Sequence, residues 1–322
     1  MAIDILNIEP TTISRDLKGK YICIYGPAKV GKTTFASRAP KNLLLAFEKG
    51  YNGLAGVKAV DINKWSDLKL VLKQLERKEA QEMYDTVTID TVGLMWQMCE
   101  DYICVANGVQ SISDIAWGKG YALCKKEFDS TLRKITKLGY GLIIIAHVEK
   151  RVEKIDDDNS IEIFSPNIPK RAYDIVNQLV DIIGFINVEY DKEGIGHRYL
   201  YTRSNPTFLA GSRFPHLPQK IPFGYTELSE ALSKAIEQSG IEDGATIVDK
   251  DKPEEIDERT FNEVRKEAEE IWTSLIKKSP DNAKKIMELV EEVFGHQMKL
   301  SEITESQVDL FKLLVDEMKA LV

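Results

Sequence analysis

A glycine-rich segment near the start of the chain has the residue types and spacing that bind a triphosphate. Residues 26–33 read GPAKVGKT and match the pattern G-x-x-x-x-G-K-[ST] at every fixed position. In this pattern main-chain N–H groups surround the phosphates, Lys32 reaches the β- and γ-phosphates, and the Thr33 hydroxyl binds Mg²⁺. The residues expected to bind the nucleotide are Gly26, Pro27, Ala28, Lys29, Val30, Gly31, Lys32, Thr33 and Thr34.

The segments on either side of this motif favour the strand–loop–helix geometry that phosphate binding requires. Residues 20–25 are apolar and rich in β-prone side chains, as a buried strand should be. Residues 34–38 can open a helix, whose N-terminal N–H groups and dipole favour a bound anion. A chance glycine-rich turn would not be expected to have both flanks, so the segment is interpreted as a phosphate-binding loop.

Three polar residues each follow an apolar, strand-like run. Glu48, Asp90 and His147 come directly after residues 42–47, 84–89 and 141–146. Because parallel strands place their carboxyl ends at one edge of a sheet, we expect these side chains near the loop. Asp90 could organise Mg²⁺, Glu48 could activate the attacking water, and His147 could contact the γ-phosphate. The alternatives are a helix N-cap for Asp90, a surface loop position for Glu48 and a structural strand end for His147.

Phosphoryl transfer also needs cations that neutralise the negative charge of the transferred group, and a neighbouring subunit can supply one. The candidate cations outside the loop are Lys150, Arg151, Arg203 and Arg213. Each of them alone is better interpreted as an ordinary surface residue, but one member of the set could act as the finger.

The order of elements that must position these residues predicts an α/β fold. Apolar runs alternate with segments of helical spacing, near 65–81, 92–106, 118–138 and 171–179. Continuous apolar strands between helices argue for a mainly parallel sheet covered on both faces. Residues 148–170 are expected to form a long loop that can include a short hairpin at 160–164. Residues 180–190 and 197–203 are expected to form a hairpin, and 226–238 a helix that Gly240 ends.

The chain is expected to divide into three parts. Residues 1–240 would form the α/β core, 241–258 an acidic linker with Pro253, and 259–322 a small all-helical module. From residue 241 onward there are 21 acidic and 12 basic residues, whereas residues 1–240 hold 30 acidic and 31 basic ones. A broad basic surface for nucleic acid is therefore absent, and any DNA contact must come from local loops.

From the sequence we expect a protein of the reducing cytoplasm that has no membrane-spanning segment. No run of 18 apolar residues exists, and the first residues, MAIDI, lack the basic start and apolar centre of a signal peptide. The four cysteines show no C-x-x-C pair, which argues against a zinc site and against a disulfide framework.

The succession of these motifs resembles the core of RecA-, RadA- and KaiC-like ATPases. More narrowly, it is similar to the short phage-encoded RecA-like ATPases of single-strand annealing recombination. The resemblance covers about residues 18–240, and its matching stretches are 25–34, 44–50, 87–90, 144–150 and 210–218. It implies that Lys32 and Thr33 bind phosphate and Mg²⁺ and that Asp90 is the second Mg²⁺-organising acid. It also implies that Glu48 is the catalytic base and His147 the sensor of the γ-phosphate.

The resemblance also implies a role for Arg213 and for assembly. The family usually carries Lys-x-Arg in the last stretch, but Gly211 replaces the lysine here and leaves Arg213 as the candidate finger. Rings or filaments with ATP at the subunit interfaces are implied, as is a DNA-contacting loop at 148–170. Between His147 and Arg171 the chain has six acidic and five basic residues, a mixed charge for such a loop.

These observations lead to an expected function. A GTPase would need N-K-x-D, but Asn63-Lys64 is followed by Trp65-Ser66, and no arginine-rich kinase lid is evident. We therefore expect an oligomeric, Mg²⁺-dependent ATPase that binds single-stranded DNA in phage recombination, in a bacterial host cytoplasm. The helical module would bind a single-strand-binding protein or another replication or recombination protein, or be a solvated appendage. The alternatives are a helicase loader, a KaiC-like regulatory ATPase, or a nucleotide-binding switch with little turnover.

Overall fold

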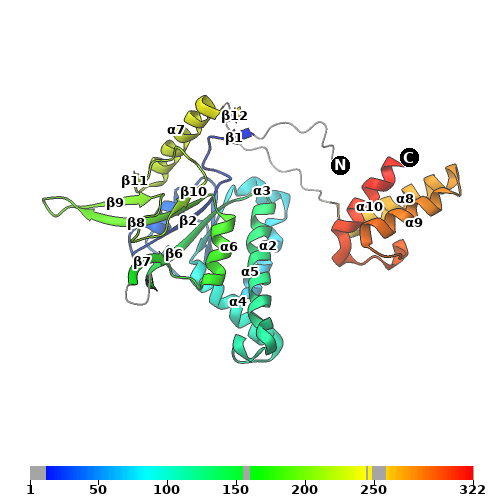
Figure 1. Ribbon diagram of the computed structural model, residues 1–322, viewed down its shortest axis with the longest axis horizontal. Helices are drawn as coiled ribbons and strands as arrows, with labels where there is room; N and C mark the ends of the chain where they lie inside the picture. Colours follow the sequence, from blue (N-terminus) through cyan, green and yellow to red (C-terminus); the bar gives the residue numbers. More distant parts are fainter. Residues whose placement is uncertain (1–11, 155–159, 244–245, 249–258, 322) are drawn as a thin grey trace. The chain divides into compact units, whose positions relative to one another are not determined.

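The computed structural model (Figure 1) describes residues 12–154, 160–243, 246–248 and 259–321. The chain forms two compact units, one within Thr11–Glu254 and another that includes Glu255–Val322. Each unit has a hydrophobic core of its own. No helix in the described ranges is long and apolar enough to cross a membrane.

The first unit alternates strands and helices along the chain. Its strands are β1 (Thr12–Ser14), β2 (Tyr21–Gly26), β3 (Asn42–Ala46), β4 (Ala59–Asp61), β5 (Thr86–Asp90), β6 (Gly141–Lys154), β7 (Ser160–Pro166), β8 (Ile182–Tyr190), β9 (Gly196–Tyr201), β10 (Gly211–Ser212), β11 (Lys220–Pro222) and β12 (Thr246–Val248). Its α-helices are α1 (Lys32–Ser37), α2 (Trp65–Leu75), α3 (Lys78–Met83), α4 (Val92–Asn107), α5 (Lys119–Lys137), α6 (Lys170–Leu179) and α7 (Tyr225–Asp243).

The main sheet has the strand order β11-β9-β8-β2-β6-β5-β3-β4. Neighbours from β8 to β4 run parallel, whereas β9 and β11 are antiparallel additions at one side. This arrangement confirms the expected α/β fold with a mainly parallel sheet. The strand before the phosphate-binding loop, β2, lies between β6 and β8, and β6 separates it from β5.

Side chains of the central strands alternate between two cores, as the period of two in a strand requires. Cys23 and Tyr25 of β2 belong to a core covered by α2, α4, α5 and α6. Ile22 and Ile24 face the other core, to which Phe35 of α1 and residues of α7 contribute. Figure 1 shows the helices α2, α4, α5 and α6 together on one side of the sheet. Burial on both faces explains why these strands read as continuous apolar runs.

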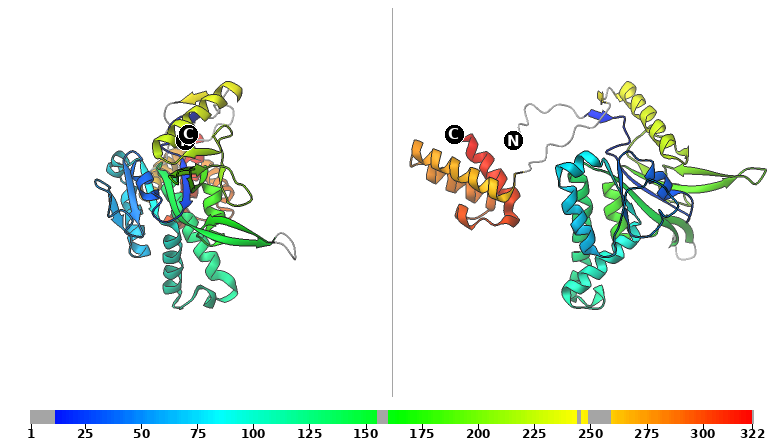
Figure 2. Two further views of the ribbon diagram at one scale, coloured as in Figure 1. Left: turned by 90° about the vertical axis from the view of Figure 1, so that its left-hand side faces the viewer. Right: turned by 180° about the vertical axis from the view of Figure 1, so that it is seen from behind.

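Two antiparallel hairpins extend from the sheet (Figures 1 and 2). The hairpin of β8 and β9 confirms the strands expected around residues 191–194. The second hairpin corrects an expectation in part: β7 covers the short hairpin expected at 160–164, but β6 continues past His147 to Lys154 where a loop was predicted. Charged residues there made the segment look like a loop, but backbone pairing from Val148 with Pro166 onward tolerates them. Residues 155–159 lie outside the described part.

The end of the first unit also differs from the expected boundary at residue 240. Helix α7 passes through Gly240 and ends at Asp243, because a glycine in a helix costs only about 1 kcal/mol and does not terminate it. Strand β12 lies within the expected linker and pairs in parallel with β1. Ile13 and Ile247 of these strands pack against the core beside α7. Residues 249–258 of the expected linker lie outside the described part.

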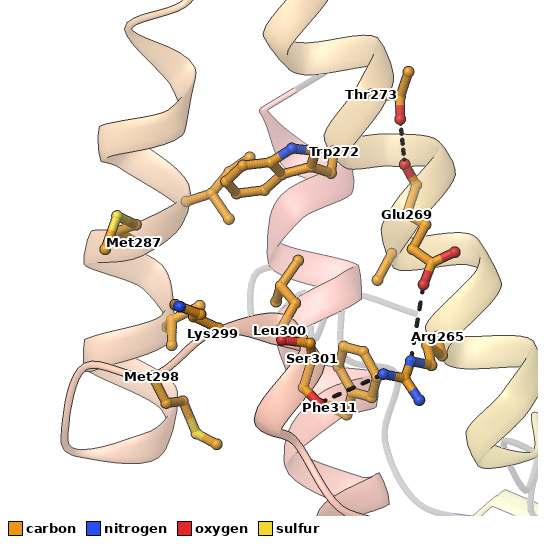
Figure 3. Close-up of a pocket in the computed structure, with 13 residues that line it drawn as sticks. Arg265, Glu269, Trp272, Thr273, Met287, Met298, Lys299, Leu300, Ser301 and Phe311 are labelled. Atoms are coloured by element: carbon orange, nitrogen blue, oxygen red, sulfur yellow. Dashed lines mark hydrogen bonds and ion pairs between the residues drawn. The ribbon is translucent and has the colours of Figure 1, made fainter.

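The second unit consists of α8 (Phe261–Lys278), α9 (Asn282–Phe294) and α10 (Val308–Ala320), with two short 3-10 turns before α10. Thr260 begins α8 with a capping box to Glu263, which satisfies N–H groups of the first turn. Its core includes the fully buried Phe311 of α10. A cavity of about 570 Å³ lies among these elements, bordered by Trp272, Met287 and other mostly apolar side chains (Figure 3).

Candidate functional site

The phosphate-binding loop connects β2 to α1, as the sequence pattern requires. Gly31 immediately precedes α1 with φ +102°, a left-handed conformation that a residue with a side chain rarely adopts. Lys29 at the tip also has a positive φ of 62° and is exposed. The loop therefore has the turn that brings successive main-chain N–H groups toward one point.

The ammonium group of Lys32 lies inside the curve of the loop. Its Nζ donates hydrogen bonds to the main-chain oxygens of Gly26, at 2.9 Å, and Pro27, at 2.7 Å. The residue is only 7% exposed. Burial lowers the pKa of Lys32, and the carboxylates of Asp90 and Glu48 oppose that shift. A positive charge held in this position can bind the phosphates of a nucleotide.

Thr33 and Asp90 come together although they are far apart in the sequence. Thr33 Oγ1 donates a 2.7 Å hydrogen bond to Asp90 Oδ2 at the carboxyl end of β5. Asp90 is 2% exposed, and burial raises the pKa of its carboxyl group while the Thr33 hydroxyl opposes the rise. A Cβ atom at Gly50 would lie 3.3 Å from Thr33 Oγ1 and 3.6 Å from Asp90 Oδ2, so this glycine keeps space open beside both oxygens.

The oxygen atoms of Thr33 and Asp90 fit Mg²⁺, which binds few protein groups and takes its other ligands from water and substrate phosphates. Among the described residues, no group of three His, Cys, Asp or Glu side chains could hold a metal ion by itself. A Mg²⁺ ion at this pair would therefore depend on the phosphate oxygens of a nucleotide.

Glu48 and His147 lie side by side at the same edge of the sheet. His147 Nε2 is 3.3 Å from Glu48 Oε1 and 3.4 Å from Glu48 Oε2. Strand register places His147 directly opposite Gly26, and the main-chain N–H groups of Phe47 and Glu48 donate to the Asp90 oxygen. The two side chains are 36% and 39% exposed, so water can reach the Glu48 carboxylate.

The other candidate cations do not lie in this site within one chain. Arg213 follows β10, which pairs with the first residues of β8 at the opposite edge of the sheet, and it forms a 3.0 Å ion pair with Asp181. Lys150 pairs with Glu162 at 3.0 Å, and Arg151 contacts Glu149. Arg203 donates to the main-chain oxygens of residues 202, 214 and 215.

Two residues beside the loop escaped the sequence analysis. Gly50 is one of several glycines after β3, and nothing in the local sequence marks the one that approaches Thr33. Arg198 of β9 donates from Nη1 to the main-chain oxygen of Val30 at 3.1 Å. Only the pairing of β8 with both β2 and β9 brings Arg198 to the loop, so a short motif could not have found it.

Comparisons with known proteins bear on this arrangement. Residues 18–214 match the protein family described as AAA domain. The "SPbeta prophage-derived uncharacterized protein YorG" of Bacillus subtilis (strain 168) is 30% identical over 333 aligned positions, covering 100% of this chain and 99% of that protein. The crystal structure of the KaiC-like protein PH0186 from Pyrococcus horikoshii OT3 matches 64% of this chain and 85% of that chain, at 13% identity and a TM-score of 0.37. The chain belongs to the AAA domain family, and its sheet and phosphate-binding loop are those of a P-loop NTPase.

Proposed function

We propose that this protein is a Mg²⁺-dependent ATPase that acts in phage DNA recombination or single-strand annealing. The observation that carries the catalytic part is the convergence of Lys32, Thr33, Asp90 and Glu48 at one edge of the sheet. Family membership supports nucleotide hydrolysis, and the prophage derivation of the relative supports a phage role.

In this proposal Lys32 holds the β- and γ-phosphates, and Thr33 and Asp90 hold Mg²⁺. When bound, the ion would neutralise part of the negative charge on the phosphate oxygens. Glu48 orients a water molecule and accepts its proton while the water oxygen attacks the γ-phosphorus, and the products are ADP and phosphate. His147 is close enough to keep the Glu48 carboxylate directed toward that water.

The proposed DNA and subunit contacts rest on the elements around this edge. One strand of the β6–β7 hairpin, β6, also carries His147. DNA bound to the hairpin would therefore contact the same β-strand that reaches the proposed catalytic site. Its cations Lys150 and Arg151 are paired with carboxylates, and a DNA strand would have to replace those partners. Because Arg213 lies at the far edge of the sheet, it could serve only the site of another copy, and the proposal includes a homo-oligomer.

The experiment measures ATP hydrolysis with and without single-stranded DNA, at two salt concentrations. We expect DNA to accelerate hydrolysis by the wild-type protein, and complementary strands to anneal faster in its presence. Lys32→Ala should abolish both ATP binding and hydrolysis. Glu48→Gln should bind ATP but turn it over about 100-fold or more slowly, because the water loses its base. Glu82→Gln, at an exposed site on α3, is the matched control and should behave as wild type.

Each part of the proposal has its own contrary result. Normal hydrolysis by Lys32→Ala would reject the site, and unchanged turnover in Glu48→Gln would reject the base. Hydrolysis that ignores DNA, together with tight ATP binding, would favour a nucleotide switch or a KaiC-like regulator. A stable complex with a hexameric helicase would favour a loader.

A further inference from the structure

A cavity of about 350 Å³ adjoins the phosphate-binding loop on the side of β8 and β9. Its walls come from three segments that are far apart in the sequence. Thr34 of α1 and Arg38 directly after it form one wall, Arg198 of β9 the second, and Phe223 and Tyr225 at the junction of β11 and α7 the third. Gly31 also lines the cavity, so the same loop borders both the phosphate position and this space.

The aromatic wall is held in place by stacking against the helix that follows the loop. The rings of Phe35 and Phe223 lie 5.4 Å apart between centroids with an interplanar angle of 10°. Tyr225 packs against the same Phe35 ring at 5.6 Å. The main-chain N–H of Phe223 donates to the Arg198 oxygen at 2.9 Å, which fixes the wall to β9.

Arg198 joins the cavity to the phosphate-binding loop. Its Nη1 donates to the Val30 oxygen at 3.1 Å, and a Cβ atom at Gly31 would lie only 2.8 Å from the same nitrogen. The guanidinium therefore lies in contact with the loop, where a side chain at position 31 would displace it. It places a permanent positive charge at the boundary between the phosphates and the cavity.

We propose that this cavity is the nucleoside subsite, which takes the base and ribose of the nucleotide whose phosphates lie in the loop. The loop contacts phosphates through main-chain groups and one ammonium group, so it cannot itself bind the rest of the molecule. Gly31 and Thr34 line the cavity, so it opens directly beside the end of the loop at which α1 begins. Its volume lies within the range of about 300–1,000 Å³ typical of small-molecule pockets. Aromatic and guanidinium groups suit the flat faces of a nucleobase.

This inference rests on the proposed nucleotide site, and the test separates the two. Calorimetry measures the binding of Mg-ATP and of inorganic tripolyphosphate with Mg²⁺, and competition with labelled ATP measures any weak tripolyphosphate binding. Phe223→Ala should weaken ATP binding about tenfold or more, as loss of a stacking partner does, and leave tripolyphosphate binding within about twofold. Lys32→Ala should weaken both ligands, because it acts on the phosphates.

Two further variants guard against a folding artefact. Phe223→Leu keeps the apolar volume beside Phe35 but removes the aromatic face, and it should show the same selective loss with an unchanged melting temperature. Tyr190→Ala removes an aromatic ring that is 74% exposed at the end of β8, and it should alter neither ligand. Equal weakening of both ligands by Phe223→Leu, or no weakening of either, overturns the nucleoside subsite. Normal binding of both ligands by Lys32→Ala would instead reject the phosphate site.

Discussion

Lys32 and Asp90 are opposite charges that the same site holds away from water. Burial lowers the pKa of Lys32 and raises that of Asp90, which means that the folded state disfavours the charged form of each group. Groups with perturbed pKa values cluster at functional sites. Burial removes the water that stabilises the charged form, and a ligand of opposite charge can stabilise it instead. A Mg²⁺ ion and a triphosphate would supply opposite charges to both groups.

A pH-dependent stability follows for Asp90. Its raised pKa means that the folded protein binds this proton more tightly than the unfolded chain does. The contribution of Asp90 to folding stability therefore falls as the pH rises from the ordinary aspartate pKa, about 4, through the raised value. Asp90→Asn removes the charge, so we expect a higher melting temperature at neutral pH and a flatter pH profile, with loss of turnover. Circular dichroism melts across this pH range check it, and a lower melting temperature at neutral pH would contradict it.

At this scale the sequence identified the residues that a linear pattern can mark. The loop motif designates Lys32 and Thr33, and the ends of apolar runs designate Glu48, Asp90 and His147, which the structure brings to one edge. Gly50 and Arg198 could not be designated in this way. Gly50 matters because Thr33 and Asp90 lie beside it, and Arg198 because it contacts Val30 of the loop. Strand pairing between distant parts of the chain creates these contacts.

Among the elements, the small pair β1 and β12 defines where the first unit ends. It joins residues 12–14 to residues 246–248, and both strands were absent from the expected fold. Three-residue strands carry too little periodic signal to be recognised, whereas the long apolar strands and α4, α5 and α6 were found within a few residues. A short hairpin was expected at 160–164, where β7 lies, but the extension of β6 to Lys154 was not predicted because its many charged residues are typical of a loop.

Two truncations test the structural role of β12. A chain that ends at residue 254 retains β12, and we expect it to keep the basal ATPase rate and the stability of the first unit. A chain that ends at residue 244 lacks β12 and loses the partly buried Ile247, so it should unfold about 1–2 kcal/mol more easily. Urea unfolding and hydrolysis rates measure both. Equal unfolding midpoints for the two chains would show that β12 contributes no stability.

On the scale of the whole molecule, each unit has its own buried core. The helical unit has about 60 described residues, a size at which one core rarely supplies more than about 3–5 kcal/mol. Phe311 lies at 0% exposure within this core. The stability of the helical unit therefore depends on a few large side chains, and the proposed nucleotide site lies in the other unit.

Phe311→Ala should unfold the helical unit and leave the first unit folded. The expected loss of about 3–5 kcal/mol is comparable to the whole stability of a unit of this size. We expect helical circular dichroism to fall while the DNA-independent ATPase rate stays at the wild-type value. Leu310→Ala, at a position 41% exposed in the same helix, should change stability by no more than about 0.5 kcal/mol. A parallel drop of ATPase rate and helicity in Phe311→Ala would contradict independent units.

The central place of β2 has a consequence for synthesis on the ribosome. This apolar strand emerges first of the core strands in the main sheet, yet its neighbours are residues 141–154 and 182–190. From Gly26 to Gly141, where the first neighbouring strand begins, the ribosome must add 115 residues, which takes roughly 6–23 s at about 5–20 residues per second. During that interval the nascent YICIY segment has no strand on either side, so chaperone capture or premature aggregation of the growing chain should concentrate there.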